Sequence, residues 1–361
     1  MNTNNEPLVT VLTPVYNGEA YLRECIESVL KQTYRNFEYH IVNNRSKDRT
    51  LEIASDYAKR DSRIRVHDNA EFVPVIENHN IAFHLLSNDS KYCKLVCADD
   101  WLFPDCITQM VAVAEANPSV GIVGSYQMSG GGSDWRNWSV RWDELPFPST
   151  VVSGRELCRA TLLDGPYVFG DPTSLLYRSD LIRKEREFFP SASPHADTSA
   201  CYKYLRDTNF GFVHQVLSYE RVHGDRQSAH SEILDGYTPA KISDLLTYGS
   251  FYLTEAEIKG RLKETLDFYY KMLALGVLGG RNTDYWRFHR EKLNELGHPL
   301  DRLRLSKAVL LKLIDLSLNP KQSVEKLLRR LSGVKFEIAG RANRGAWRQK
   351  AGAGASTVLP Q

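Results

Sequence analysis

The stretch LVTVLTPVYNGEAYLRECIESVLKQTY, residues 8–34, opens an alternating pattern of strand and helix. Its first six residues, LVTVLT, are apolar and rich in β-branched side chains, which predicts a buried strand. The turn-forming pair NG follows, and Leu22, Ile26 and Val29 then recur at helical spacing. The stretch therefore predicts a strand, a turn and an amphipathic helix in direct succession.

The same alternation continues to about residue 125. Further strands are predicted at FEYHIV, RIRVHD, KYCKLVCA and VGIVGSY, with helical patterns between them. Ser46 is expected to cap the helix that carries Leu51 and Ala54, and Pro104 to open another helix. Strands that alternate with helices imply an α/β fold with a doubly wound, mostly parallel sheet flanked by helices. In such a sheet a ligand binds beyond the carboxyl ends of the strands.

The remainder of the 361-residue chain divides by composition. Residues 129–150 are rich in Gly, Ser and Trp, and we expect a mobile loop or excursion over the site there. The pattern predicts an α/β domain at 1–235, a mostly helical C-terminal extension at 236–332 and a basic, disordered tail at 333–361.

The net charge of +2 is unevenly placed along the chain. Residues 301–350 carry 13 Lys/Arg and 4 Asp/Glu, so the rest of the chain is acidic. This asymmetry favours an anionic partner for residues 301–350, either a membrane surface or nucleic acid. No nucleic-acid-reading motif accompanies the basic residues, so a nucleic acid is not expected. One interpretation is an interfacial helix on an anionic membrane, and the alternative is an ordinary amphipathic helix packed on the protein.

The cysteines and the apolar runs bear on the compartment. The six cysteines show no C-x-x-C pair, the N-terminus has no basic-then-apolar leader, and no apolar run approaches the roughly 18 residues that span a bilayer. We therefore expect free thiols and a cytoplasmic location, or a peripheral one on the cytoplasmic membrane face.

Three polar clusters follow predicted strands directly: TPVYNG at 13–18, VNNRSKD at 42–48 and ADDW at 98–101. Because the carboxyl ends of parallel strands share one edge of a sheet, the three clusters should converge. The adjacent carboxylates of Asp99 and Asp100 would repel each other unless a cation joined them, and oxygen ligands suit Mg²⁺ or Mn²⁺. The alternative for Asp100 is a helix N-cap before Trp101.

Two further residues in these clusters suit a nucleoside. Tyr16 follows Pro14 on a rigid turn, and an aromatic ring there can stack on a base. Asn44 offers an amide donor and an acceptor for a pyrimidine edge. The alternatives are packing of Tyr16 on the first helix and a turn role for Asn44. The sequence has no G-x-G-x-x-G after the first strand and no P-loop motif, so a diphosphate would depend on a metal and basic side chains.

Residues 8–34, together with FEYHIVNNRSKDRT and CADDWLFPD, make the first 230 residues resemble a family 2 glycosyltransferase with the GT-A fold. The resemblance implies that Pro14 and Tyr16 hold the nucleoside, that Asn44 contacts the base, and that Asp99 and Asp100 form the D-x-D-like metal motif. Asn43-Asn44 replaces the family's common acidic pair, and Cys97 replaces the first acid of D-x-D.

The resemblance also assigns residues later in the chain. Asp197 matches the position of the catalytic base in inverting members, and His223 matches a late histidine that reaches the metal or the diphosphate. The alternatives are a helix N-cap for Asp197 and a loop histidine that binds backbone for His223. Asp171 lies in a segment expected near the sugar, and a turn before Pro172 is the favoured interpretation for it.

The expected activity is metal-assisted, inverting transfer of a sugar from a nucleotide-diphosphate donor, with a UDP-sugar favoured. The expected cofactor is Mn²⁺ or Mg²⁺, and the expected acceptor is a hydroxyl of a glycan or lipid-linked glycan, as in polysaccharide or cell-envelope biosynthesis. One alternative is a nucleotide-sugar-binding protein without transfer activity. Another is a sugar nucleotidyltransferase, which would need a Gly-rich basic loop that TPVYNG lacks.

Overall fold

The computed structural model describes residues 6–131, 138–146, 150–191, 193, 195–224 and 233–318. The chain forms two compact units, Met1–Leu262 and Lys263–Gln361. The first unit includes residues 236–262, which the sequence pattern placed in the helical extension. The tail expected at 333–361 lies outside the described residues.

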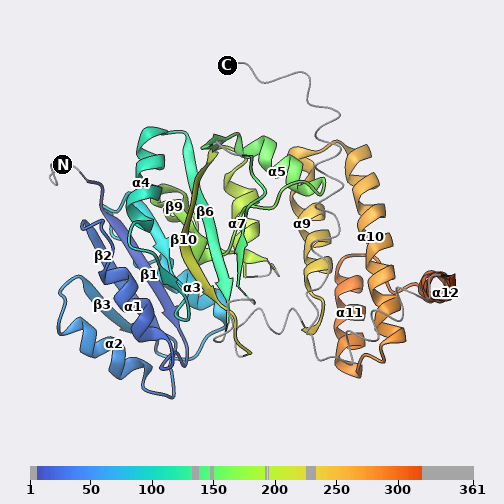
Figure 1. Ribbon diagram of the computed structural model, residues 1–361, viewed down its shortest axis with the longest axis horizontal. Coiled ribbons are helices and arrows are strands. Elements are labelled where there is room, and N and C mark those ends of the chain that lie inside the picture. The colour runs from blue at the N-terminus through green and yellow to red at the C-terminus, as the bar shows by residue number, and fades with distance from the viewer. Residues whose placement is uncertain are drawn as a thin grey trace. The chain divides into compact units, whose positions relative to one another are not determined.

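Ten strands in the described part of the first unit form one sheet (Figure 1). The strands are β1 (Val9–Val15), β2 (Phe37–Asn43), β3 (Ile64–Asp68), β4 (Tyr92–Leu95), β5 (Trp101–Leu102), β6 (Val120–Gly130), β7 (Ser139–Arg141), β8 (Val151–Val152), β9 (Leu175–Arg178) and β10 (Asn209–Arg221). Their order is β3-β2-β1-β4-β9-β6-β10-β5, with β7 on β6 and β8 on β10. The pairings among β1 to β4 and between β6 and β10 are parallel, so the mostly parallel α/β sheet is confirmed.

Helices cover both faces of this sheet because successive side chains of a strand point to opposite faces. Val11 of β1 joins a core with α1, α2 and α4, and the next residue, Leu12, joins a second core with α3, α5, α6, α7 and α9. The helices are α1 (Leu22–Leu30), α2 (Thr50–Ala58), α3 (Val75–Phe83), α4 (Cys106–Ala116), α5 (Gly154–Leu162), α6 (Ser179–Arg183), α7 (Ala196–Tyr204) and α9 (Tyr237–Tyr252).

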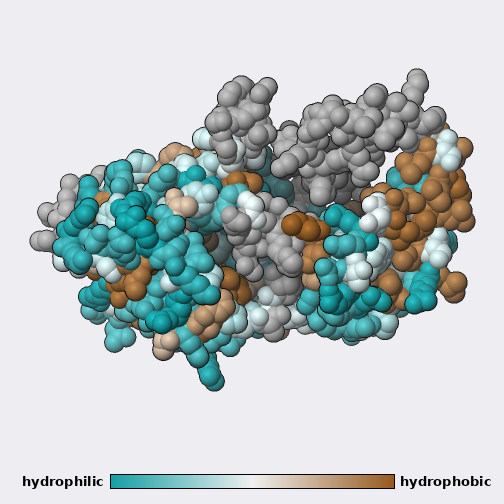
Figure 2. Space-filling model, turned by 90° about the horizontal axis from the view of Figure 1, so that it is seen from below, coloured by the Kyte–Doolittle hydropathy of each residue, from teal (hydrophilic) through white to brown (hydrophobic). Residues whose placement is uncertain are grey.

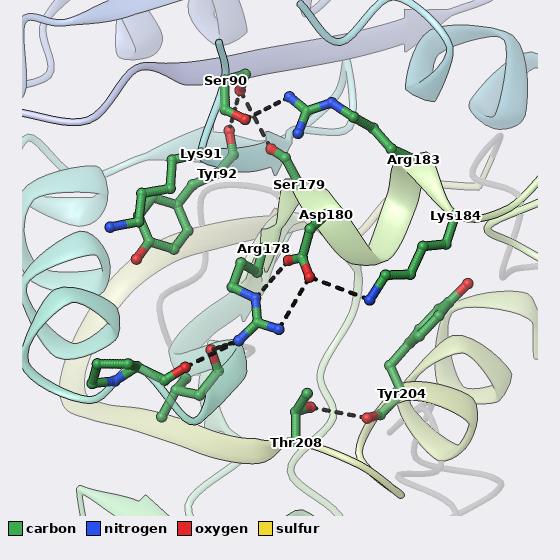
Figure 3. Close-up of polar contacts among 12 residues, drawn as sticks. Ser90, Lys91, Tyr92, Arg178, Ser179, Asp180, Arg183, Lys184, Tyr204 and Thr208 are labelled. Atoms are coloured by element: carbon green, nitrogen blue, oxygen red, sulfur yellow. Dashed lines mark hydrogen bonds and ion pairs between the residues drawn. The ribbon is translucent and has the colours of Figure 1, made fainter. Parts of the chain in front are cut away.

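The antiparallel strand β9 is fixed by arginines at its end (Figure 3). Arg178 forms an ion pair with Asp180 at 2.5 Å and donates to the carbonyl oxygen of Pro118. Arg183 of α6 donates to the carbonyl oxygen of Ser90 at 2.6 Å. These contacts join the C-terminal end of β9 to the segments that precede β4 and β6; β9 lies between these two strands and follows the short 3₁₀ turn η3 (Pro172–Ser174).

One local expectation from the sequence is wrong. Helix α2 begins at Thr50 without a side-chain cap, and the Ser46 hydroxyl instead accepts a hydrogen bond of 2.9 Å from the amide of Asn17. In residues 129–150, where a mobile loop or excursion is expected, β6 extends to Gly130 and Ser139–Arg141 pairs with it as β7, and this pairing satisfies backbone groups of both strands. Residues 132–137 and 147–149 of that segment lie outside the described residues.

Most of the second unit that is described is helical, as expected. It contains most of α10 (Glu255–Leu278), together with α11 (Thr283–Glu295) and α12 (Arg302–Leu318). A hydrogen bond of 2.7 Å joins Tyr269 of α10 to His289 of α11, whereas α12 contains no buried residue. Among the described helices, none has both the length and the hydropathy needed to cross a bilayer. All six cysteines are unpaired, and Cys97 is the one that is not fully buried.

Candidate active site

A pocket of about 620 Å³ lies where β1, β2 and β3 end. The rings of Tyr16 and Phe72, both largely exposed, meet edge to face at 4.9 Å on its wall. Asp68 accepts hydrogen bonds from the Asn43 amide at 2.6 Å and from Arg45 at 3.0 Å. The lining consists of Tyr16, Asn43, Arg45, Ser46, Lys47, Leu51, Asp68 and Phe72. An aromatic pair beside a carboxylate suits a nucleoside, whose base stacks and also hydrogen-bonds.

The pocket is shaped by contacts between the loops after β1 and β2. Asn17 takes a positive φ of 50°, and its side-chain oxygen accepts from the Lys47 amide at 2.8 Å. The Gly18 amide donates to the Thr50 hydroxyl at 2.7 Å. Pro14 is buried inside β1 opposite Val42, so it supports the loop that carries Tyr16 and does not line the pocket.

Asn44 lies beneath the pocket. Its buried amide donates to the carbonyl oxygen of Val73 at 2.8 Å and accepts from the Val73 amide at 3.0 Å and from Asn69 at 3.1 Å. Both ends of the Asn44 amide are therefore used within the protein, and they fix the loop that carries Phe72. The resemblance implies a base contact for Asn44, but Asn44 does not line the pocket. Asn43, the residue before it, does.

An acidic cluster follows β4. Ligand atoms of Cys97, Asp99 and Asp100 all lie within 4.8 Å of one another. His223, which follows β10, places its Nε2 atom 2.9 Å from a carboxylate oxygen of Asp99. The sequence assignments Asp99, Asp100 and His223 thus come together from two distant segments, and the imidazole of His223 contacts a carboxylate rather than backbone.

Asp100 is nearly inaccessible and connects three segments. Its carboxylate accepts from the Thr173 hydroxyl at 2.6 Å and from the Arg221 amide at 3.0 Å. Burial, and then the charges of Asp171 and Asp99, raise the pKa of Asp100 well above its ordinary value. The N-cap alternative for Asp100 is wrong, because strand β5 follows it and α4 begins only at Cys106. A divalent cation fits this donor set, since two carboxylates and an imidazole bind it and its charge offsets their repulsion.

Asp171 borders the cluster and caps η3. Its carboxylate accepts from the Ser174 amide at 3.0 Å within a capping box, which is the expected turn role. Burial, and then the charge of Glu220, raise the pKa of Asp171 to about 7. The preceding Gly170 has φ of +71°, and a Cβ there would come within 1.9 Å of the Ser174 hydroxyl.

Asp197 is the second residue of α7. His195 occupies the N-cap position, so the N-cap alternative for Asp197 is wrong. The carboxylate of Asp197 accepts from the Thr198 amide at 2.8 Å, which places it at the positive end of the helix. Burial raises the pKa of Asp197, and the nearby His195 lowers it. A half-buried carboxylate of raised pKa can accept a proton from a hydroxyl.

The sequence patterns did not single out Phe72 or Asp68, and they included Thr173 only as part of the segment Gly170–Ser174, which the resemblance places near the sugar. Asp68 ends the strand RIRVHD, so the argument applied to the other strand ends could have found it. Phe72 and Thr173 act through residues distant in the chain, and no local pattern marks them.

The sheet, with the pocket after β1 to β3 and the acidic cluster after β4, has the GT-A fold of glycosyltransferases. The structure is similar to the crystal structure of S. aureus TarS in complex with UDP-GlcNAc, with a TM-score of 0.57, 19% sequence identity and coverage of 80% of each chain.

Sequence comparisons name the family. Residues 10–184, just under half of the 361-residue chain, match the family model "Glycosyl transferase family 2", which supports a glycosyltransferase of this family. An uncharacterized glycosyltransferase of Haemophilus influenzae is 27% identical over 62% of this chain and 68% of its own length. The putative glycosyltransferase EpsH of Bacillus subtilis is 37% identical over 30% of each chain, so the match spans less than a third of that relative.

Proposed function

We propose that this enzyme transfers a sugar from a nucleoside-diphosphate sugar, with a UDP-sugar favoured, to a hydroxyl of a glycan or lipid-linked glycan. The observation that carries the proposal is that the pocket of Tyr16 and Phe72 follows β1 to β3, while Asp99 follows β4 of the same sheet. β1 and β4 are adjacent parallel strands, so the loops after them open at the same edge of the sheet. A donor whose base enters the pocket can then direct its diphosphate toward Asp99. The complex of TarS with UDP-GlcNAc supports this choice of donor.

Each end of the donor meets suitable groups. Tyr16 and Phe72 would contact the faces of the base, and Asp68 and Asn43 offer hydrogen-bonding atoms for its edge. Mn²⁺ or Mg²⁺ would be held by Asp99, Asp100 and His223, and would offset the charge that develops on the leaving diphosphate. Because Asp100 already accepts two hydrogen bonds, Asp99 is the more available carboxylate.

Asp197 is proposed as the base that takes the proton from the acceptor hydroxyl. As that O–H bond breaks, the acceptor oxygen bonds to the anomeric carbon and the bond from that carbon to the diphosphate breaks. A single displacement of this kind inverts the anomeric configuration. Transfer with retention would require a second displacement through an enzyme nucleophile.

Two other functions fit the site less well. A nucleotide-sugar-binding protein would not need a carboxylate of raised pKa such as Asp197 near the donor site. A sugar nucleotidyltransferase would bind a triphosphate, and the loop Thr13–Gly18 offers it no basic side chain.

We also propose that α12 contacts an anionic membrane, which would bring the enzyme to a lipid-linked acceptor on the cytoplasmic face. The large apolar side chains exposed on α12 are Leu303, Leu310, Leu311, Leu313, Ile314 and Leu318. Arg302, Arg304, Lys307 and Lys312 lie among them, in the segment 301–350 that is strongly basic. Figure 2 shows a face of the molecule on which hydrophobic residues gather in one broad patch. Apolar burial combined with basic charge favours an anionic lipid surface.

The deciding experiment measures binding and transfer together. Melting temperatures are recorded with UDP, GDP, CDP and their sugars, with Mn²⁺ and then with EDTA. We expect one nucleotide to raise the melting temperature only with metal, and Asp99→Asn to abolish that shift. Asp89→Asn, a substitution of an exposed aspartate, serves as the control. Released nucleotide and transferred sugar are then measured with the donor so identified. If no donor binds, or if a bound donor is neither hydrolysed nor transferred, the proposal is wrong.

A further inference from the structure

A histidine and a buried aspartate lie beside the proposed base. The Nδ1 atom of His195 is 3.3 Å from a carboxylate oxygen of Asp244 on α9. Asp244 is only 4% exposed, and in the described part of the chain His195 is the basic side chain that the structure pairs with it. Because a buried carboxylate is costly without a partner, this contact fixes the ring of His195.

A chain of hydroxyl groups fixes the same pair from the other side. Ser199 donates to the second carboxylate oxygen of Asp244 at 3.1 Å and is hydrogen-bonded to the Ser193 hydroxyl at 2.7 Å. Ser193 in turn accepts from the backbone amide of His195 at 3.1 Å. Both the backbone and the imidazole of His195 are therefore positioned, two residues before Asp197.

The charges of His195 and Asp244 affect the ionisation of Asp197. Burial alone would favour the protonated acid, which cannot accept a proton. The charge of His195 opposes burial and lowers the pKa of Asp197, whereas the charge of Asp244 raises it. The described titratable groups that interact with Asp197 are His195 and Cys201 of α7, Asp244 of α9, Tyr177 of β9, and Tyr167 and Asp171 near η3. Among these groups His195 alone can carry positive charge.

We infer that His195, held by Asp244, is a positioning residue that keeps Asp197 in its ionised, proton-accepting form during transfer. The inference rests on the proposed role of Asp197 as the base. Asp244 lies on α9, which is beyond the residues that match the family model but belongs to the same compact unit as the site. Asp244 orients His195, and His195 in turn keeps the base Asp197 ionised.

The test is the pH profile of kcat/KM for the acceptor in His195→Gln, Asp244→Asn and His195→Lys. Without the positive charge that His195 can carry, Asp197 becomes harder to ionise, so the acid limb of His195→Gln should move upward by about one pH unit. Its activity should then be about tenfold below wild type on the acid limb and close to wild type at pH 9. His195→Lys restores a positive charge and should return the limb toward wild type. Asp244→Asn loosens His195 but also removes a charge that raises the pKa of Asp197, so the two effects oppose each other and the limb should move less than in His195→Gln.

Three controls separate this inference from the proposed function. Nucleotide binding by thermal shift should be unchanged in all three variants, and His84→Gln, on an exposed histidine, should leave the profile unaltered. If His195→Gln lowers activity equally at every pH, or leaves the acid limb in place, His195 does not tune the base. If Asp197→Asn retains transfer activity, the base assignment itself fails. An inactive Asp197→Asn with an unmoved limb in His195→Gln overturns only the inference drawn here.

Discussion

The ammonium group of Lys94 donates a hydrogen bond of 2.6 Å to the carbonyl oxygen of Thr173 in the interior of the first unit. It donates a second bond, of 3.0 Å, to the carbonyl oxygen of Leu175. Lys94 is fully buried, and burial lowers its pKa. The Thr173 hydroxyl donates to Asp100 and accepts from the amide of Cys97 at 3.0 Å. The buried lysine thus secures the turn that supports the acidic cluster.

Replacing Lys94 with Met should destabilise the protein and weaken metal binding together. Met has a similar volume but leaves two buried carbonyl oxygens without this donor, a loss of roughly 2–4 kcal/mol in the free energy of unfolding. Urea unfolding and titration with Mn²⁺ measure the two effects. Lys91→Met removes an exposed lysine that is paired with Glu115, and should change stability by less than about 1 kcal/mol. Equal stabilities of the two variants would contradict the supporting role of Lys94.

Asp171→Asn should stabilise the metal-free protein at neutral pH but not in acid. The pKa of Asp171 is about 7 in the folded protein against an ordinary value of 3.8. Its charge therefore opposes folding, and the free energy of unfolding contributed by this group falls as the pH rises from about 4 to about 7. Asn keeps the cap of η3 but removes the charge. We expect a gain of roughly 1–3 kcal/mol at pH 8 in EDTA, and almost none at pH 4.

Urea midpoints across this pH range measure the gain. Asp164→Asn, on an aspartate that pairs with Arg261 at 2.8 Å and away from the acidic cluster, is the matched control. It should show no gain at pH 8. A constant difference between Asp171→Asn and wild type at all pH values would mean that the charge of Asp171 is not what the substitution removes.

Phe72→Ala should weaken nucleotide binding without lowering stability. The ring is 59% exposed, so its removal leaves no cavity, while loss of a stacking surface costs roughly 1–3 kcal/mol of binding free energy, or about 5- to 150-fold in Kd. Isothermal titration with the nucleoside diphosphate measures the change. Phe268 of α10 is equally exposed, and Phe268→Ala should bind as wild type does. Unchanged affinity in Phe72→Ala would place the base elsewhere.

These residues show what the sequence could and could not predict. The positions of Tyr16, Asp99 and Asp100 after buried strands follow from periodicity, although β4 ends at Leu95, earlier than the predicted strand KYCKLVCA. The role of Asn44 does not follow from periodicity, because it depends on Val73, which is 29 residues away and is brought near by the loop after β3.

The same limit applies to the acidic cluster. Thr173 reaches Asp100 across 73 residues of sequence, through the antiparallel insertion of β9 that the alternating pattern did not indicate. Local periodicity predicts which edge of the sheet holds the site. The partners that hold the site together depend on non-local topology.

The apolar side chains of α12 should be needed for membrane binding if the helix lies at a lipid surface. Leu303 is 84% exposed, and the helix buries no residue within the protein, so substitutions there should not affect folding. Wild type should sediment with vesicles that contain anionic lipid at low salt and should dissociate as salt rises, because screening weakens the attraction of the basic residues. Leu310→Gln combined with Leu311→Gln should reduce binding about tenfold or more, since burial of two leucine side chains contributes several kcal/mol to the binding free energy.

The control is Ile233→Gln combined with Leu163→Gln, which alters two exposed apolar residues of the first unit and should leave sedimentation unchanged. Vesicles of zwitterionic lipid alone should bind weakly, because they offer apolar burial without charge complementarity. Both double variants should keep full transfer to a water-soluble acceptor, since neither touches the strand-end site. If wild type does not sediment with anionic vesicles at low salt, the exposed leucines serve another purpose and the membrane contact is wrong.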